Sequence, residues 1–428
     1  MLIKKLFKMS FFSLCILFLA IMFGGCLRRP VHDVSELREP VTFSVNYATG
    51  DFLTTSLKHS ILAEFQRLNP HITIVERLTP NLRILSAVGE FPDLLEFRHS
   101  TDFFETGKIG EMPADIVEMF AITRNFNDRV YAIPMTRGYT IGIVYSKRIF
   151  RELGINSSNI KTWNDFLDVC QKIKDVGITP LAAGFADIWH WGFWWNYFWQ
   201  REISLNNPNW ISYRHEGKVS FTDPEVRAVL TGFQELFARG FFIENWNSIS
   251  EAQCPGILVS GQAAMYYIGQ FVFQQIAELD PEFEFGFFAL PDNYGRINII
   301  GGLGDTGWAI SAEAQKDPAR AEAIYDFIRF FFSREVYSDF LNRTNTMSSL
   351  KEKFDYPVSE QFRKVLRIVE NADNEHYSWS IMDRPNDLPE GFRNFSYRLA
   401  TQYFLNLHTI DEVLYAMDRE WERTKSVR

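Results

Sequence analysis

Strand-like and helix-like segments alternate from residue 41 onwards, and this alternation limits the available folds more than any other feature of the chain. VTFSVNYA, at 41–48, alternates in polarity as a half-buried strand does, and a helical segment that ends at Pro70 follows it. ITIVERL and FPDLLEF predict two further strands. The pattern predicts an α/β fold, in which ligands bind beyond the carboxyl ends of strands.

Three later helices are marked by their terminal residues. The helix WNDFLDVCQKIKDV is preceded by Thr162, a good N-cap, and stops at Gly177. Two others begin with Asp-Pro pairs, at 223–224 and 317–318, because aspartate caps a helix and proline fits its first turn. A mature chain of about 400 residues exceeds what one ordinary core encloses, so we expect two domains.

The N-terminus has the features of a secretory signal, over residues 1–25. Three lysines precede an apolar run that is shorter than the roughly 20 residues preferred by a membrane span. Cys26 follows two glycines and resembles the lipidated cysteine of bacterial lipoproteins, although Phe23 stands where leucine is usual. The alternative is an uncleaved anchor over 9–27. Both interpretations place the rest of the chain outside the cytoplasm, with 26–39 as lipid anchor and tether.

Charge and motifs exclude several functions. The net charge of −9 becomes −12 without the signal, which holds three lysines and no acidic residue, so nucleic acid is a poor partner. HExxH, GxSxG, Walker and CxxC motifs are absent from the sequence, and no cysteine or histidine spacing indicates a metal. GLGDTG, at 302–307, matches GxGxxG, but the following WAIS predicts a strand, whereas a dinucleotide fingerprint opens a helix. We therefore expect no cofactor, and a glycine stretch where the backbone bends or approaches a ligand.

Seven segments carry a resemblance that covers nearly the whole mature chain. They are ILAEFQRLNPHITIVE, FPDLLEF, RVYAIPMTRGYTIGIVYSKRIFRELGI, KTWNDFLDVCQKIKDVGITPLAAG, LVSGQAAMYYIGQF, EFGFFALP and GGLGDTGWAIS. In this order the chain resembles the family 1 extracellular solute-binding proteins, the sugar-binding lipoproteins that feed ABC importers. Ser146 and Gln262 depart from the asparagine and lysine that are usual at their positions.

The resemblance implies an α/β, two-lobed periplasmic-binding-protein fold of type II. Lobe 1 would comprise 40–138 and 304–342, and lobe 2 would comprise 139–303 and 343–428. Ligand binds between the lobes in this family, and the lobes close over it. Three hinge crossings between the discontinuous lobes are implied, near Gly138–Ile141, Ile300–Leu303 and Asn342–Thr346.

The stretch FADIWHWGFWWNYFWQ, at 185–200, holds five of the eleven tryptophans. It follows a strand after which family members present aromatic residues to the ligand, and a sugar offers an apolar C–H face to such rings. Helical spacing over 191–199 instead predicts core packing. We therefore expect part site wall and part core, with ligand contacts at Trp189, His190, Trp191 and Trp195.

The resemblance implies further ligand-binding residues at strand ends and crossings. Gln270 and Phe271 occupy the place where family members often stack an aromatic ring on the sugar. Asp93 is expected to support its strand end instead, and the alternative for Arg137 is a surface salt bridge. The other candidates are Tyr47 and Asp51 after the first strand, Phe97, Arg98 and His99 after the third, Arg137 and Tyr139 at the first crossing, Asp305 and Trp308 beside the glycine stretch, and Trp379.

These observations predict a lipid-anchored, monomeric binding protein without catalysis. It would capture a sugar, oligosaccharide or polyol for the permease subunits of an ABC importer. One alternative is a sensory or adhesive lipoprotein of the same fold. Another is a carbohydrate-active enzyme, because glycoside hydrolases also line clefts with tryptophan and need two carboxylates at a set separation.

The lipoprotein interpretation predicts the outcome of Cys26→Ser. Without a thiol to acylate, the variant should carry no fatty acid and should stay unprocessed or be released. Labelling of cells with a fatty acid, followed by isolation of the protein, measures this outcome. Label that persists in the variant would contradict lipidation at Cys26, and Cys15→Ser, inside the signal, is the matched control.

Overall fold

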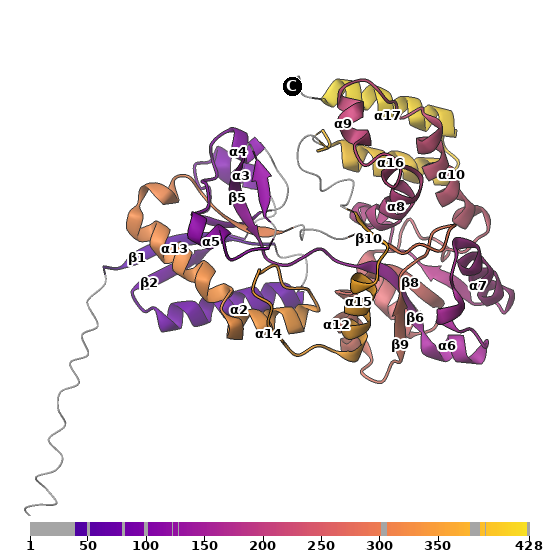
Figure 1. The fold of residues 1–428 in the computed structure, drawn as a ribbon, viewed down its shortest axis with the longest axis horizontal. Coiled ribbons are helices and arrows are strands. Elements are labelled where there is room, and N and C mark those ends of the chain that lie inside the picture. The colour runs from indigo at the N-terminus through magenta and orange to yellow at the C-terminus, as the bar shows by residue number, and fades with distance from the viewer. Residues whose placement is uncertain are drawn as a thin grey trace, which may run out of the picture. The chain divides into compact units, whose positions relative to one another are not determined.

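Two larger β-sheets and a pair of short strands form the framework of the computed structural model (Figure 1). The structure describes residues 39–48, 52–78, 82–97, 102–121, 123–126, 128–300, 306–376, 386–389 and 391–425. No helix within these ranges is both long and apolar enough to span a membrane.

The first sheet consists of β1 (Val41–Asn46), β2 (Ile72–Glu76), β3 (Leu94–Phe97), β4 (Arg124–Phe126), β5 (Arg129–Pro134) and β11 (Gly307–Ile310). Its order is β2-β1-β3-β11-β5-β4. β1 pairs in parallel with β2 and β3, while β11 is antiparallel to β3 and β5, and β4 is antiparallel to β5. The strands expected at 41–48, ITIVERL and FPDLLEF are therefore confirmed, each slightly shorter than the pattern suggested.

β11 enters the first sheet from a distant part of the chain. Gly307 pairs with Phe97 of β3 on one side and with Pro134 of β5 on the other. A Cβ at Gly307 would lie 2.4 Å from the carbonyl oxygen of Ile133, so glycine permits this close approach of two backbones. The strand expected after GLGDTG is confirmed.

Successive side chains of these strands point to opposite faces of the first sheet, and each face is covered by an apolar layer. Trp308 faces the larger layer and Ala309 the smaller one, which includes Phe97 and Phe103. The larger layer contains α2 (Phe52–Leu68), α13 (Pro318–Phe331) and α14 (Arg334–Thr344). Figure 1 shows α13, in orange, beside β1 and α2.

The second sheet consists of β6 (Ile141–Ser146), β7 (Thr179–Ala182), β8 (Ala263–Gly269) and β9 (Phe285–Phe288), in the order β7-β8-β6-β9. β7 and β8 are parallel, and β6 is antiparallel to β8 and β9. Every residue of β8 is buried. Two further strands, β10 (Asn298–Ile300) and β12 (Asn374–His376), pair in parallel with each other.

Helices cover both faces of the second sheet. Tyr267 of β8 faces one layer, whereas Tyr266 faces the other, which also contains the buried free thiol of Cys254. The first layer contains α7 (Trp163–Asp175), α8 (Trp191–Trp199), α10 (Pro224–Ala238), α16 (Phe392–Phe404) and α17 (Ile410–Thr424). The second contains α11 (Cys254–Val259), α12 (Val272–Leu279) and α15 (Glu360–Glu370).

Short helical elements connect these layers. The α-helices are α3 (Leu82–Ala87), α4 (Asp102–Glu105), α5 (Ala114–Val117), α6 (Lys147–Glu152) and α9 (Trp210–His215). The 3₁₀ turns are η1 (Ser157–Asn159), η2 (Ile188–His190), η4 (Glu251–Gln253) and η5 (Ala314–Lys316), and η3 (Gln200–Ser204) is a π-helical turn that extends α8.

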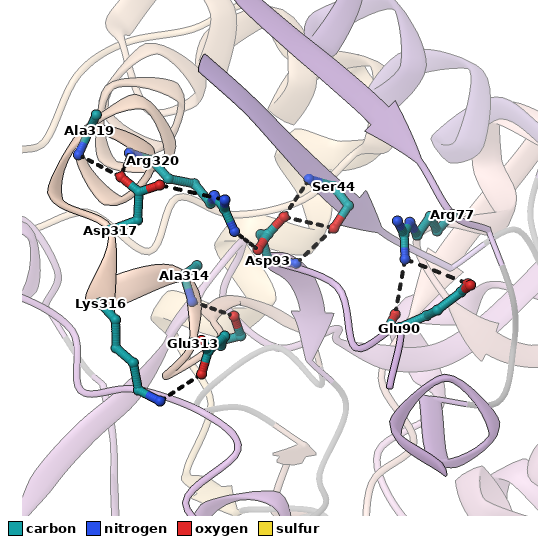
Figure 2. Close-up of polar contacts among 11 residues, drawn as sticks. Ser44, Arg77, Glu90, Asp93, Glu313, Ala314, Lys316, Asp317, Ala319 and Arg320 are labelled. Carbon is teal, nitrogen blue, oxygen red and sulfur yellow. Dashed lines mark hydrogen bonds and ion pairs between the residues drawn. The ribbon is translucent and has the colours of Figure 1, made fainter. Parts of the chain in front are cut away.

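The expected helix caps are confirmed for two helices. The hydroxyl of Thr162 accepts the N–H of Asp165 at 3.2 Å, and the Asp165 carboxylate accepts the N–H of Thr162 at 2.8 Å, which forms a capping box for α7. Asp317 accepts the N–H groups of Ala319 and Arg320 at the start of α13 (Figure 2). Such caps satisfy backbone donors that have no partner within the helix.

The chain moves more than once between the elements of the two sheets. β5 of the first sheet ends at Pro134, and β6 of the second begins at Ile141. β11 returns the chain to the first sheet at Gly307, and after α14 ends at Thr344 the chain reaches α15 of the second core. The fold has the discontinuous connectivity that the resemblance implies, and the lobe boundaries given above stay a prediction.

Candidate ligand-binding site

Four partly exposed aromatic rings form a connected row beside the second sheet. The ring of Phe271 makes a T-shaped contact with Tyr139, at a centroid distance of 5.1 Å, and lies 6.3 Å from the ring of Phe193. Phe193 makes a T-shaped contact with Trp189 at 5.6 Å. Trp189 is 41% exposed, and the other three are half-buried. We call Tyr139, Phe271, Phe193 and Trp189 the aromatic strip.

Sheet topology brings the aromatic strip to one edge. Ile141, at the start of β6, pairs with Gly269, at the end of β8, so the residues before β6 and after β8 are neighbours. Trp189 in η2 and Phe193 in α8 follow β7, which is parallel to β8 and ends at the same edge. The strip therefore lies beyond the carboxyl ends of β7 and β8, where α/β sheets bind ligands.

Gln270 adds unused hydrogen-bonding capacity beside the strip. Its side chain is fully buried, and its Oε1 accepts the N–H of Thr140 at 2.9 Å. Within the described ranges, Nε2 of Gln270 and the hydroxyl of Thr140 have no hydrogen-bond partner. A buried polar group without a partner costs about 1–3 kcal/mol. A rearrangement that exposes this pair to a ligand hydroxyl would recover that free energy.

Arg137 connects the first crossing to β12. Its Nη2 lies 3.2 Å from Oε1 of Glu375, and its N–H donates to the carbonyl of Met347 at 2.9 Å. Both charged side chains are about one-third or more exposed, so the ion pair contributes only about 0–1 kcal/mol to folding. Its main consequence is positional, because it joins the first crossing to β12.

His190 lies beneath the strip rather than in it. Its ring is fully buried against Trp189, Phe193 and Tyr266, and Nδ1 accepts the N–H of Gly184 at 3.3 Å. Burial lowers the pKa of His190 to about 3, so the imidazole is neutral at physiological pH. In this conformation His190 supports Trp189, whereas the sequence predicted a ligand contact.

The other tryptophans of the stretch are core residues. Trp191 is 1% exposed and stacks on Phe404, with centroids 5.4 Å apart and rings 8° from parallel. Trp195 is fully buried and stacks on Trp199. The predicted ligand contacts at Trp191 and Trp195 are therefore absent from the surface in this conformation, because side chains of α16 and of α8 itself cover both rings.

The predicted residues of the first sheet are also buried. Tyr47 donates a hydrogen bond from its hydroxyl to Glu76, and burial raises the pKa of Tyr47 above its usual range. Phe97 packs against Phe104 at 4.7 Å, and Trp308 is fully buried in T-shaped contacts with rings of α13. In this conformation these three rings belong to the cores. Asp51, Arg98, His99, Asp305, Trp379 and Cys26 lie outside the described residues.

A buried ion pair holds the end of β1 against β3. Nζ of Lys58 lies 2.5 Å from Oε2 of Glu96, and both side chains are almost fully buried. The same oxygen of Glu96 accepts the N–H of Ala48 at 2.8 Å. Removing one partner of such a pair leaves an uncompensated charge. The pair thus fixes the start of the loop in which Asp51 was predicted to contact the ligand.

Asp93 has the supporting role that the sequence indicated. Its Oδ2 accepts the N–H of Ser44 at 2.7 Å and the Ser44 hydroxyl at 2.8 Å, and Figure 2 shows these bonds. Nη1 of Arg320 lies 3.4 Å from the other carboxylate oxygen. Asp93 therefore joins β1, β3 and α13 and serves the fold of the first sheet.

Two residues of the candidate site were missed by sequence reasoning. Phe193 was not singled out from the sequence, yet its ring bridges Trp189 and Phe271. Glu375 carried no motif, since its partner Arg137 is 238 positions away. In the ranges that the structure covers, no cluster of three or more His, Cys, Asp or Glu side chains is placed to hold a metal ion.

His190→Asn tests the neutral imidazole. Histidine in an unfolded chain titrates near pH 6.5, and in the folded protein the pKa of His190 is about 3. As the pH falls between these values, the unfolded chain binds the extra proton, so His190 reduces stability on acidification. Asparagine keeps an acceptor near Nδ1 without titrating. The free energy of unfolding in urea should therefore fall less between pH ~7.5 and ~5 in the variant; equal losses would contradict this role.

Comparison with known proteins agrees with the fold. A chitin oligosaccharide binding protein superimposes with a TM-score of 0.78 at 18% sequence identity, covering 90% of this chain and 98% of that protein. The solute-binding protein RafE in complex with raffinose superimposes with a TM-score of 0.74 at 18% identity, covering 90% of this chain and 100% of its own. The chain therefore has the two-lobed periplasmic solute-binding fold.

Sequence comparison identifies the family. The multiple sugar-binding protein of Streptococcus mutans is 24% identical over 340 residues, which cover 74% of this chain and 77% of that protein. The family model of bacterial extracellular solute-binding proteins matches residues 100–337, more than half of the chain. The chain therefore belongs to the family of bacterial extracellular solute-binding proteins.

Proposed function

We propose that this solute-binding protein captures a carbohydrate and delivers it to the permease subunits of an ABC importer. The observation that carries the proposal is the aromatic strip, a row of four partly exposed rings at the ligand-binding edge of the second sheet. The family is extracellular, so the chain acts outside the cytoplasm. Catalysis is not part of the proposal.

The chemistry of the strip suits a sugar. One face of a pyranose carries C–H groups that pack on aromatic rings, while its hydroxyl groups need hydrogen-bond partners. Phe271 and Trp189 offer the first kind of surface. Gln270 would offer a donor once a rearrangement exposes its Nε2, and the partly exposed Arg137–Glu375 pair carries further donors and acceptors. The rings are already held by their neighbours, so binding would immobilise few side chains.

The relatives support the same ligand class. The Streptococcus mutans relative is a multiple sugar-binding protein, and RafE was solved in complex with raffinose. We extend carbohydrate binding to this chain because the strip lies where such a ligand is expected. We also propose that the six predicted residues outside the described ranges keep their roles, namely ligand contacts at Asp51, Arg98, His99, Asp305 and Trp379 and lipidation at Cys26. We expect the protein to act as a monomer.

Lobe closure gives a prediction on shape. With lobe 1 at 40–138 and 304–342 and lobe 2 at 139–303 and 343–428, ligand would draw the lobes together by a hinge motion. The radius of gyration from small-angle scattering should then fall as the ligand saturates the protein. A radius that stays constant through saturation would argue against closure, and the Trp189→Ala variant at the same ligand concentration is the control.

Two tryptophans of the same stretch provide the test of the site. A thermal-shift screen of sugars, oligosaccharides and polyols first finds the ligand, since a ligand that binds the native state stabilises it. Trp189→Ala should then weaken binding about thirtyfold, or about 2 kcal/mol. It should lose much less stability than a core variant, because Trp189 is 41% exposed.

Trp199→Ala is the matched control, because this ring is 2% exposed and packs on Trp195. It should lose about 3–5 kcal/mol of the free energy of unfolding, while its folded fraction keeps wild-type affinity. Calorimetric titration and urea unfolding measure the two effects. Wild-type affinity in both Trp189→Ala and Phe271→Ala would exclude the strip as the site. Absence of any stabilising carbohydrate would contradict the ligand class.

A further inference from the structure

A second pocket lined by aromatic residues lies beside the second sheet. Its volume is about 380 Å³, at the lower end of the range of roughly 300–1,000 Å³ that ligand pockets occupy. None of its lining residues belongs to the strip. The pocket is lined by Phe237, Gly240, Phe242, Ile243, Glu244, Asn245 and Trp246.

The backbone that carries this pocket continues the second sheet. Leu181 of β7 donates its N–H to Phe241 and accepts the N–H of Ile243, both at 3.0 Å, so 241–243 runs alongside β7 in parallel. Phe185 then donates its N–H to the carbonyl of Trp246 at 3.1 Å. Trp246 therefore lies at the carboxyl edge of the sheet, just after the segment that pairs with β7.

The apolar walls of the pocket are preorganised. Trp246 is half-buried and makes T-shaped contacts with Phe237, Trp191 and Phe185, at centroid distances of 4.9, 5.6 and 5.9 Å. Because three rings contact it, the exposed part of the Trp246 indole is held in a fixed orientation. A rigid indole of this kind binds a flat apolar face at low entropic cost.

The polar rim of the pocket has unused hydrogen-bonding groups. Glu244 and Asn245 are exposed, and in the described parts of the chain neither side chain has a hydrogen-bond or ion-pair partner. Asn245 adopts φ of 55°, and its carbonyl accepts the N–H and the hydroxyl of Ser248 at 2.8 and 2.9 Å. The turn is therefore held by its backbone, which leaves the carboxylate and the amide available.

We propose that this pocket is a second carbohydrate site, which takes one neutral pyranose unit. Trp246 and Phe237 would cover the C–H face of the pyranose. Glu244 and Asn245 would accept hydrogen bonds from its hydroxyl groups, and such bonds to a carboxylate are strong. The unpaired charge of Glu244 disfavours acidic sugars. The pocket shares no lining residue with the strip, so the proposal goes beyond the transport function and does not depend on it.

The test follows one indole by fluorine NMR. The full mature chain is labelled with 5-fluorotryptophan, and the Trp246 line is assigned as the one that is lost in Trp246→Phe. Neutral methyl pyranosides of the gluco, galacto, manno and xylo series are then titrated into the labelled protein. At least one should shift the Trp246 line saturably, and should do so equally in the Trp189→Ala background, while glucuronic acid should not. The line of Trp421, which packs on Phe221 and Phe392, is the control that should stay unmoved.

The rim is tested with Glu244→Gln. This variant should bind the neutral sugar roughly tenfold more weakly, because a charged acceptor is removed. It should also discriminate less against glucuronic acid.

The proposal is overturned if no neutral pyranoside shifts the Trp246 line, or if the shift vanishes in the Trp189→Ala background, which would trace the shift to the strip. Equal binding of glucuronic acid to the wild type would overturn the role of Glu244. Loss of transport ligand binding in Trp189→Ala, with the Trp246 shift intact, separates the two sites.

Discussion

The backbone pairing of β11 between β3 and β5 is the interaction on which the rest of the structure depends. These four residues return to the first sheet after the chain has built the second, so the first sheet is complete only when both halves of the sequence are present. Gly307 makes the close approach of the strands sterically feasible, and Trp308 attaches α13 through Phe327 and Phe331. This connectivity makes the chain cross between its two sheets more than once.

Burial divides the aromatic side chains into two physical roles. Trp191 and Trp195 lie fully inside the second core, where they contribute dispersion and hydrophobic free energy to folding. Trp189 and Trp246 are each supported by neighbouring rings and still present surface to solvent. A ring held in this way has already lost its conformational freedom, so a ligand gains contact area without ordering it. The same residue type therefore stabilises the fold in one position and presents a fixed apolar surface to solvent in another.

Local signals in the sequence predicted the elements well and the site less completely. Thr162 and the Asp-Pro pair at Asp317 act within one helical turn, so their caps can be read directly from the chain. Asp93 follows the same logic, because it lies next to the strand that it supports. Phe193 was missed because helical spacing describes which residues share a face and not what covers that face.

By itself, the sequence determined the α/β pattern, the helix ends, and the family, because each rests on short-range order or on segments in a fixed succession. Only the tertiary structure decided which rings are exposed. Trp191 is buried because Phe404 of α16 stacks on it, and Arg137 is paired because Glu375, 238 positions later, lies beside it. Exposure and pairing depend on groups that are distant in sequence, and the periodicity of a single segment contains no record of such neighbours.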